Sequence, residues 1–360
     1  MQLAARLVAM FALTVFLAAA GRGEDEPGSI GWLRAAYAGP PASWPAPHLE
    51  EGAKFTEFGP LERPDRPTGL AAEQAALGED LFTDPRLSAS GQIACENCHN
   101  RRLGWGDALP VSFGHDRQQG TRNAQSLFTA AYMRELFWDG RAASLEAQAH
   151  LPIINPVEMA AEASEIEQRL NTIPEYREAF ASAYGKDRIH MSDVAAALAT
   201  FQRTIRLPSS RFDRVFSRGI SVLSDEELRG LHLFRTKAGC ANCHNGPLLS
   251  DQEYHNLQIS FYGRRFEDIG RYAVTGDPRD VGRFRTPSLR GLSRTGPYMH
   301  NGLFSGLRGI VNLYAAGGGR DRTRQSPTTQ APPPQPDPLL KQRDLSSEER
   351  DAIVAFLETL

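Results

Sequence analysis

The sequence predicts a mainly helical protein made of two small domains in tandem. One short motif, Cys-x-x-Cys-His, occurs at residues 95–99 and again at residues 240–244. A similar helical stretch, which contains Gly-x-x-Leu-Phe, precedes each copy, at residues 78–82 and 230–234. Signals for β-strands are few, and a chain of 360 residues is long enough for two domains. These observations suggest an internal duplication.

Cys-x-x-Cys-His is the attachment sequence of a c-type haem. Two thiols bond to the porphyrin, and the adjoining imidazole becomes the proximal ligand of the iron. The two copies therefore predict two covalently bound c-type haems, held by Cys95, Cys98 and His99 in the first motif and by Cys240, Cys243 and His244 in the second. The alternatives are one zinc site built from both cysteine pairs, or two local disulfides. Neither explains why a histidine follows each second cysteine.

The composition is that of an ordinary globular protein, with 41% hydrophobic and 23% charged residues. The formal net charge is -3 and no long basic run occurs, so nothing suggests a nucleic-acid partner. All four cysteines belong to the two motifs. No disulfide framework and no free thiol therefore remain outside them.

Residues 1–23 have the pattern of a secretory signal peptide, with Arg6, an apolar run at residues 7–17 and small residues at 18–21. The apolar run is shorter than the roughly 20 residues that span a bilayer, which disfavours the alternative of an uncleaved anchor. No later stretch is apolar enough to cross a membrane, so we expect no integral span in the mature chain. Export to the periplasm agrees with the haem prediction, since bacteria attach haem covalently outside the cytoplasm.

Residues 24–70 are rich in proline and glycine and predict an extended N-terminal arm lying over the first domain. Helices are predicted at residues 70–82 and 192–206 from the spacing of their apolar residues. Two more are predicted after the capping boxes that begin at Ser224 and Ser346.

Residues 317–337, which are rich in Gly, Arg and Pro, predict a flexible surface excursion. We expect two cytochrome c-like haem domains, at residues 71–215 and 216–360.

The chemistry of two haems depends on the residues on their distal sides. An electron carrier closes each iron with two strong ligands, whereas a haem that activates peroxide needs an open site and an acid-base group. The segment after the first motif is dense in candidates for these roles, among them His115, Trp138, Gln148 and Glu158.

From about Leu77 to the last helix, the sequence resembles the bacterial di-haem cytochrome c peroxidase and MauG family. Besides the two haem motifs, the matching stretches are Gly-His at 114–115, Arg-Asn at 122–123, Phe-Trp-Asp-Gly-Arg at 137–141, Pro-x-Glu-Met at 156–159, Thr-Pro-Ser-Leu-Arg at 286–290 and Pro-Tyr-Met-His-Asn-Gly at 297–302. The resemblance implies a first domain that reacts with peroxide and a second that transfers electrons.

The resemblance also implies roles for single residues. His115 matches the histidine that closes the first iron at rest and swings away on activation. Glu158 matches the distal acid-base carboxylate, with Gln148 and Pro152 lining the same pocket. Trp138 matches the tryptophan between the two haems. Three further residues match the positions that hold a calcium ion between the domains, namely Asn123, Thr295 and Pro297.

The distal ligand of the second haem departs from the peroxidase pattern. Peroxidases usually have a methionine there, but an ungapped alignment from Pro297 puts Tyr314 at this position, as in MauG. A phenolate is a hard anionic ligand, so the second haem should have a low potential. Met299 is the rival ligand, although in relatives this stretch coexists with a separate ligand downstream. His115, in contrast, is a peroxidase feature.

We therefore expect a periplasmic peroxidase that reduces hydrogen peroxide to water with electrons from a small donor protein, a cytochrome c or a cupredoxin. The alternative is a MauG-like enzyme that oxidises Tyr or Trp residues of a partner protein through a high-valent haem state. A third reading is a non-catalytic di-haem electron-transfer protein, against which the acid-base candidate Glu158 argues. Relatives are often homodimers, and the composition does not decide this point.

Overall fold

The computed structural model describes residues 26–322 and 324–360, so the predicted signal peptide at 1–23 lies outside the described residues. The prediction of a mainly helical fold is confirmed, and the described residues contain a single two-stranded sheet. In chain order the helices and strands are α2 (Ile30–Ala36), α3 (Leu70–Thr83), α4 (Leu145–Ile154), α5 (Ala163–Thr172), α6 (Pro174–Tyr184), α7 (Met191–Thr204), α8 (Arg211–Arg218), α9 (Asp225–Arg235), β1 (Tyr254–His255), α10 (Tyr272–Thr275), β2 (Phe284–Arg285), α11 (Leu307–Ala315) and α12 (Ser347–Leu357).

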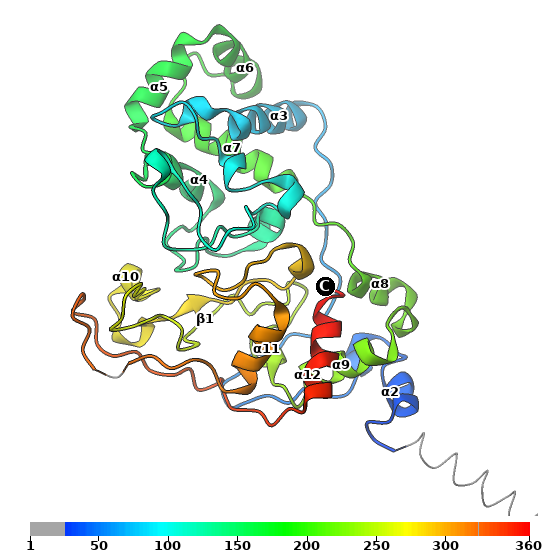
Figure 1. The fold of residues 1–360 in the computed structure, drawn as a ribbon. Helices are drawn as coiled ribbons and strands as arrows, with labels where there is room; N and C mark the ends of the chain where they lie inside the picture. Colours follow the sequence, from blue (N-terminus) through cyan, green and yellow to red (C-terminus); the bar gives the residue numbers. More distant parts are fainter. Residues whose placement is uncertain (1–25, 323) are drawn as a thin grey trace, which may run out of the picture.

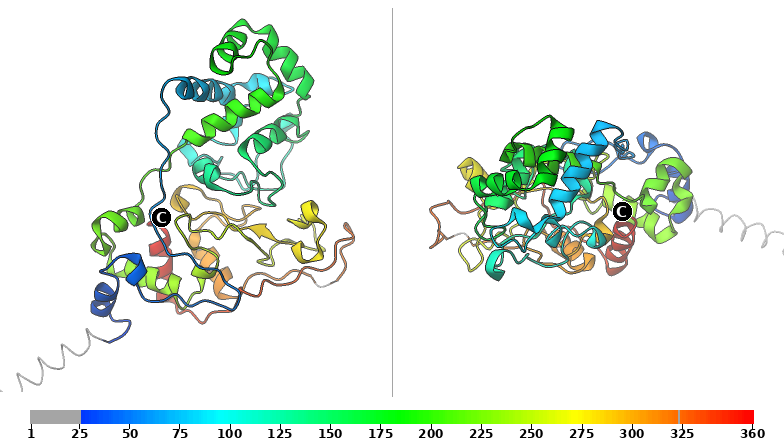
Figure 2. Two further views of the ribbon diagram at one scale, coloured as in Figure 1. Left: turned by 180° about the vertical axis from the view of Figure 1, so that it is seen from behind. Right: turned by 90° about the horizontal axis from the view of Figure 1, so that it is seen from above.

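The chain forms two halves. Helices α3 to α7 make the first half, which lies above the second half from α8 to α12 in Figure 1, and the same division is visible from behind in Figure 2. Each half has its own hydrophobic cluster, and the first cluster ends at Leu207 whereas Phe212 already belongs to the second. We therefore propose that the domain boundary lies at residues 208–211, slightly before the position expected from the sequence.

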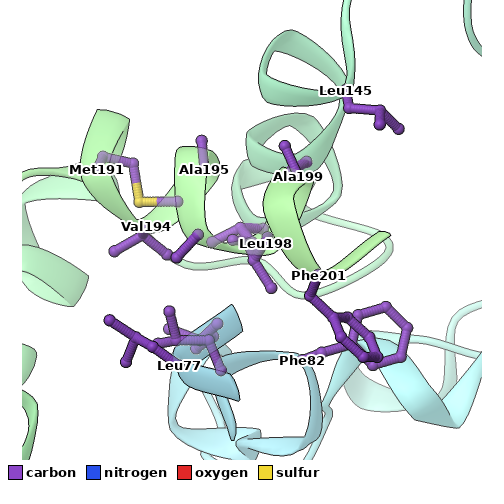
Figure 3. Close-up of a cluster of buried hydrophobic side chains, with 14 of the residues drawn as sticks. Leu77, Phe82, Leu145, Met191, Val194, Ala195, Leu198, Ala199 and Phe201 are labelled. Carbon is purple, nitrogen blue, oxygen red and sulfur yellow. The ribbon is translucent and has the colours of Figure 1, made fainter. Parts of the chain in front are cut away.

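The first half is built on the pair α3 and α7. Leu77 and Phe82 of α3 face Val194, Leu198 and Phe201 of α7 in the core (Figure 3). A glycine in α3, Gly78, allows the two helices to approach closely, because a Cβ atom there would collide with the carbonyl oxygen of Ala197.

The second half repeats this arrangement with α9 and α12. Gly230 of α9 occupies the place of Gly78, and a Cβ atom on it would collide with the carbonyl oxygen of Ala352 in α12. Ser224 and Ser346 cap α9 and α12 as predicted, each with a side-chain oxygen that accepts from a backbone N–H in the first turn. The two Gly-x-x-Leu-Phe stretches thus occupy equivalent places, as an internal duplication requires.

The N-terminal arm differs from the expectation in two respects. It contains the short helix α2, because Ser29 caps it by accepting from the N–H of Trp32. Its buried side chains pack on the second half, so the expectation that it lies over the first domain is wrong for most of its length; only its last part meets the first half, where Tyr132 donates to the carbonyl of Glu62 and Arg206 to that of Pro64. Four of its side chains join the second hydrophobic cluster, namely Leu33, Tyr37, Trp44 and Phe58.

A buried cation explains where the arm lies. Arg235 at the end of α9 is fully buried, and it pairs with Glu57 of the arm and donates to the carbonyl of Pro45. Its guanidinium also lies 5.4 Å from the ring centroid of Trp44. A buried charge needs such partners, and in the described chain they come from the arm.

Candidate active site

One internal cavity of about 410 Å³ lies between the two halves. It is lined by residues from both, including all four cysteines and both histidines of the Cys-x-x-Cys-His motifs. The two motifs, far apart in the sequence, therefore open into the same space.

The two motif histidines are oriented as metal ligands are. His99 Nδ1 lies 3.1 Å from the carbonyl oxygen of Trp105, and His244 Nδ1 lies 3.0 Å from that of Leu249. A ring nitrogen beside a carbonyl carries the proton, so Nε2 is left with the lone pair that can bind iron. Burial lowers the pKa of both imidazoles, which favours the neutral form that a metal requires.

The motif cysteines lie in two short 3₁₀ turns and are free thiols, so the disulfide alternative is wrong. Burial raises the pKa of Cys95 and of Cys240 to about 12, which keeps both thiols neutral. Within residues 26–322 and 324–360, the one cluster of side chains with metal-ligand spacing is Cys243, Asp251 and His255, which does not join the two cysteine pairs. The single zinc site is therefore excluded, and the cavity, thiols and histidines together fit two haems.

The cavity wall beside the first motif carries the predicted acid-base group. Glu158 follows α4, which contributes Gln148 and Pro152 to the same wall. Burial raises the pKa of Glu158, and the positive charge of Arg141 opposes this in part. A carboxyl group with a raised pKa holds its proton to a higher pH than an exposed one and can release it again.

The predicted distal histidine of the first haem does not line the cavity. The backbone N–H of His115 donates to the carbonyl of Glu158 (2.8 Å), so the two residues are neighbours. The ring is partly buried, with Nε2 3.4 Å from Asp116 and Nδ1 buried without a hydrogen-bond partner. Its neighbour Gly114 lines the cavity, whereas His115 itself does not.

Trp138 lies in the cavity wall where the two halves meet. Its indole N–H donates to the carbonyl of Asn123 (3.0 Å), and its ring contacts that of His300 edge-on, with 6.5 Å between centroids. His300 stacks on Phe284 of β2 at 3.7 Å, and burial lowers its pKa to about 4. These three rings form a continuous aromatic contact across the junction.

Both candidate ligands of the second haem line the cavity. Tyr314 lies on α11, and its pKa is raised by burial first and then by the nearby thiols of Cys243 and Cys240. Met299 lies in a loop beside His300 with a positive φ of 73°. Tyr314 is thus the candidate whose surroundings include the second motif.

The three residues that match the calcium positions also line the cavity at the junction. Asn123 lies next to Trp138 through the indole hydrogen bond, and its own N–H donates to the carbonyl of His300 (2.7 Å). Thr295 and Pro297 lie in the loop just before His300.

Two ionic groups at the site were not predicted from the sequence. Arg122 bonds to Asp139 of the first half and to Asp268 of the second, both nearly buried, and so ties the halves together beside the cavity. The Arg-Asn and Trp-Asp motifs indicated two members of this group, but nothing in the sequence indicated Asp268.

The second group is centred on His255, which lies between Asp251 (2.8 Å) and Asp337 (2.9 Å). Burial disfavours its charge, but the hydrogen bonds to the two carboxylates raise its pKa to about 12. This imidazolium fixes the segment around residue 337 beside the second motif.

Comparison with known proteins agrees with this geometry. A family model described as di-haem cytochrome c peroxidase matches residues 72–220. The chain is 38% identical to the cytochrome-c peroxidase IdrP1 of Pseudomonas sp. (strain SCT), over 81% of each chain. It is also 38% identical to the methylamine utilization protein MauG of Methylorubrum extorquens, over 81% of this chain and 79% of that protein.

Among solved structures, a MauG-like protein associated with microbial copper homeostasis superposes with a TM-score of 0.70 at 29% identity, covering 88% of this chain and 93% of that one.

Proposed function

This chain belongs to the di-haem cytochrome c peroxidase family, and we propose that it reduces hydrogen peroxide to water in the periplasm with electrons from an external donor protein. Family membership makes it an oxidoreductase with two haems. The periplasmic location is supported by the signal-peptide pattern of residues 1–23. Over residues 26–322 and 324–360, no helix combines the length and the apolar character needed to cross a bilayer.

We propose that both haems are attached covalently, through Cys95 and Cys98 and through Cys240 and Cys243. The free thiols in the cavity wall and the orientation of His99 and His244 support this. Haem iron supplies the site that binds peroxide and takes up its oxidising equivalents.

The single observation that carries the proposal is the partly buried Glu158 in the cavity wall beside the first motif. In this role Glu158 accepts the proton from one oxygen of hydrogen peroxide and returns it to the other oxygen as the O–O bond breaks. Gln148 and Pro152 shape the pocket around the peroxide. Trp138 carries electrons between the two haem sites, and its contact with His300 supports that path.

Three assignments complete the proposal. His115 closes the first iron in a resting state that differs from the described conformation. Tyr314 binds the second iron. One calcium ion at the junction is held through Asn123, Thr295 and Pro297.

A second candidate function is MauG-like oxidation of Tyr or Trp residues on a partner protein. The presence of Tyr314 beside the second motif favours it, since a phenolate stabilises oxidised iron. A MauG protein among the relatives is compatible with this candidate, as the peroxidases are with the first.

Absorption and EPR spectra of the purified ferric protein would test these functions, followed by hydrogen peroxide with and without prior one-electron reduction. Two low-spin haems that react only after half-reduction would support a peroxidase gated by His115. A high-spin haem beside a Tyr-ligated low-spin haem, with immediate reaction, would support the MauG-like function. Two firmly six-coordinate haems that never react with peroxide would contradict both and leave an electron-transfer protein.

A further inference from the structure

A polar pocket of about 440 Å³ opens on the surface between the two halves. It shares one lining residue, His255, with the 410 Å³ cavity described above. Tyr254 and His255 of β1 line it. In Figure 1, β1 lies on the side of the second half that faces the first. The lining of the pocket also includes Arg134, Glu135, Arg271, Asp280 and Arg283. Tyr254 is 9% exposed, so an oxidisable ring lies just below this surface.

The hydroxyl of Tyr254 has a proton acceptor beside it. It donates to Glu135 Oε2 at 2.7 Å, and Arg271 donates to the same oxygen at 3.1 Å. The side chain of Glu135 is 37% exposed, so a proton placed on it can exchange with solvent. Burial raises the pKa of Tyr254. Burial alone would also raise the pKa of Glu135, but the hydrogen bonds from Tyr254 and Arg271 lower it, so at rest the proton stays on the phenol.

Tyr254 is also next to the chain segment that carries Trp138. In the antiparallel pair β1–β2, Tyr254 lies opposite Arg285, whose backbone N–H donates to the carbonyl of Trp138 (2.8 Å). A Cβ atom on Gly140, two residues after Trp138, would collide with the Tyr254 hydroxyl. About one strand spacing, roughly 4.8 Å, therefore separates the backbone of Tyr254 from that of Arg285.

We propose that Tyr254 is an electron-relay residue that passes single electrons from a donor at the surface pocket toward Trp138, with Glu135 as its proton acceptor. This inference rests on the proposed function, since hydrogen peroxide is the oxidant. When the peroxide-oxidised site takes one electron from Tyr254, the phenolic proton moves to Glu135. The products are a neutral phenoxyl radical and a protonated Glu135.

The external donor then returns one electron to the phenoxyl radical, and the proton moves back from Glu135. Two such cycles deliver the two electrons that, with two protons from solvent, convert one hydrogen peroxide into two waters.

The position of Arg271 explains why the proton must leave. Its guanidinium carbon lies 3.7 Å from the centroid of the Tyr254 ring. A second positive charge on the ring would be repelled at this distance, so a radical cation is disfavoured. Oxidation of Tyr254 therefore requires loss of the phenolic proton, and Glu135 already accepts its hydrogen bond.

The matched control is a second tyrosine bonded to a carboxylate. Tyr176 on α6 donates to Asp84 at 2.5 Å, but it belongs to the cluster of the first half, away from the surface pocket. Tyr176→Phe thus removes the same kind of hydrogen bond without touching the proposed relay.

The test uses the complete holoprotein, produced with ordinary or ring-deuterated tyrosine, mixed with hydrogen peroxide and frozen for EPR. We expect a radical signal that narrows with deuterated tyrosine, disappears in Tyr254→Phe, forms more slowly in Glu135→Gln and persists in Tyr176→Phe. An equally strong tyrosyl signal in Tyr254→Phe would overturn the relay. So would a wild-type protein whose haem spectrum responds to peroxide but which forms no tyrosyl radical.

If the haem spectrum of the wild-type protein does not respond to peroxide, the proposed function fails, and the relay is tested separately. Flash-generated tris(bipyridine)ruthenium(III) oxidises surface-accessible residues without haem turnover. A tyrosyl radical that forms in wild type and Tyr176→Phe but not in Tyr254→Phe would support the relay. Equal yields in all three proteins would overturn it.

Discussion

Burial is the main cause of the pKa shifts of the side chains that line the cavity. Glu158 is the clearest case, because burial raises its pKa above the ordinary value of 4.5. A carboxylate accepts the proton of peroxide only when it is deprotonated. The rate of reaction with peroxide should therefore rise with pH through this raised pKa, with the midpoint above pH 4.5.

The substitution Glu158→Gln should abolish this rise of the rate with pH, called here the acidic limb of the pH profile. It should also slow the reaction by about 10²- to 10⁴-fold, the usual contribution of general acid-base catalysis. Stopped-flow rates of the reaction with hydrogen peroxide from pH 4 to 8 would measure both effects. Glu165→Gln, at an exposed carboxylate of α5, is the control and should leave the pH profile unchanged. An acidic limb that survives in Glu158→Gln would assign it to another group.

The sequence predicted those site residues that belong to a short local motif. The cysteines and histidines of the two motifs are fixed within five residues, and the structure has all six in the cavity wall. Arg122 and Asp268 are different, because they meet only when the two halves come together. For His115 the sequence predicted a position near the first haem but not the direction of its ring, which does not line the cavity.

Each half is built on one pair of packed helices, α3 with α7 and α9 with α12. A glycine lies at each contact, Gly78 in the first pair and Gly230 in the second. Gly78→Ala and Gly230→Ala should each lower the free energy of unfolding by about 1–3 kcal/mol, the usual cost of overpacking. The cause is collision of the new methyl group with the backbone of α7 or α12. Chemical denaturation monitored by circular dichroism would measure the loss.

Gly306→Ala is the matched control for these substitutions. Gly306 precedes α11, and a Cβ atom on it would meet no atom within 4 Å. Because Gly306 is the N-cap of α11, its replacement should cost about 0.5 kcal/mol, the penalty of an alanine cap without any collision. Equal losses in all three variants would mean that helix contact is not the reason for the two glycines.

Helices could be predicted from the sequence where a cap and an apolar stripe occur together. The capping boxes at Ser224 and Ser346 predicted the starts of α9 and α12, and the structure has both. The pairing of α9 with α12 could not be predicted, because more than a hundred residues separate the two helices. For the same reason, the arm before α3 was assigned to the wrong half.

At the scale of the whole molecule, the arm links the two halves in an unexpected order. It packs first on the second half, through Trp44 and Phe58, and only then runs up to α3 in the first half (Figure 1). The arm thus completes the core of a domain that begins about 140 residues after the arm ends. Its connection to α3, at residues 65–69, has few buried side chains.

Cutting this connection should therefore leave the arm bound. We expect that, after cleavage at a protease site inserted at residues 65–68, the arm peptide stays with the rest of the protein during size-exclusion chromatography. The buried side chains of the arm and the pair of Arg235 with Glu57 provide the binding energy. Trp44→Ala should release the cleaved arm, because it removes about 3–5 kcal/mol of packing and leaves Arg235 without one aromatic contact. If the cleaved wild-type arm dissociated as readily as the Trp44→Ala arm, the second half would not depend on it.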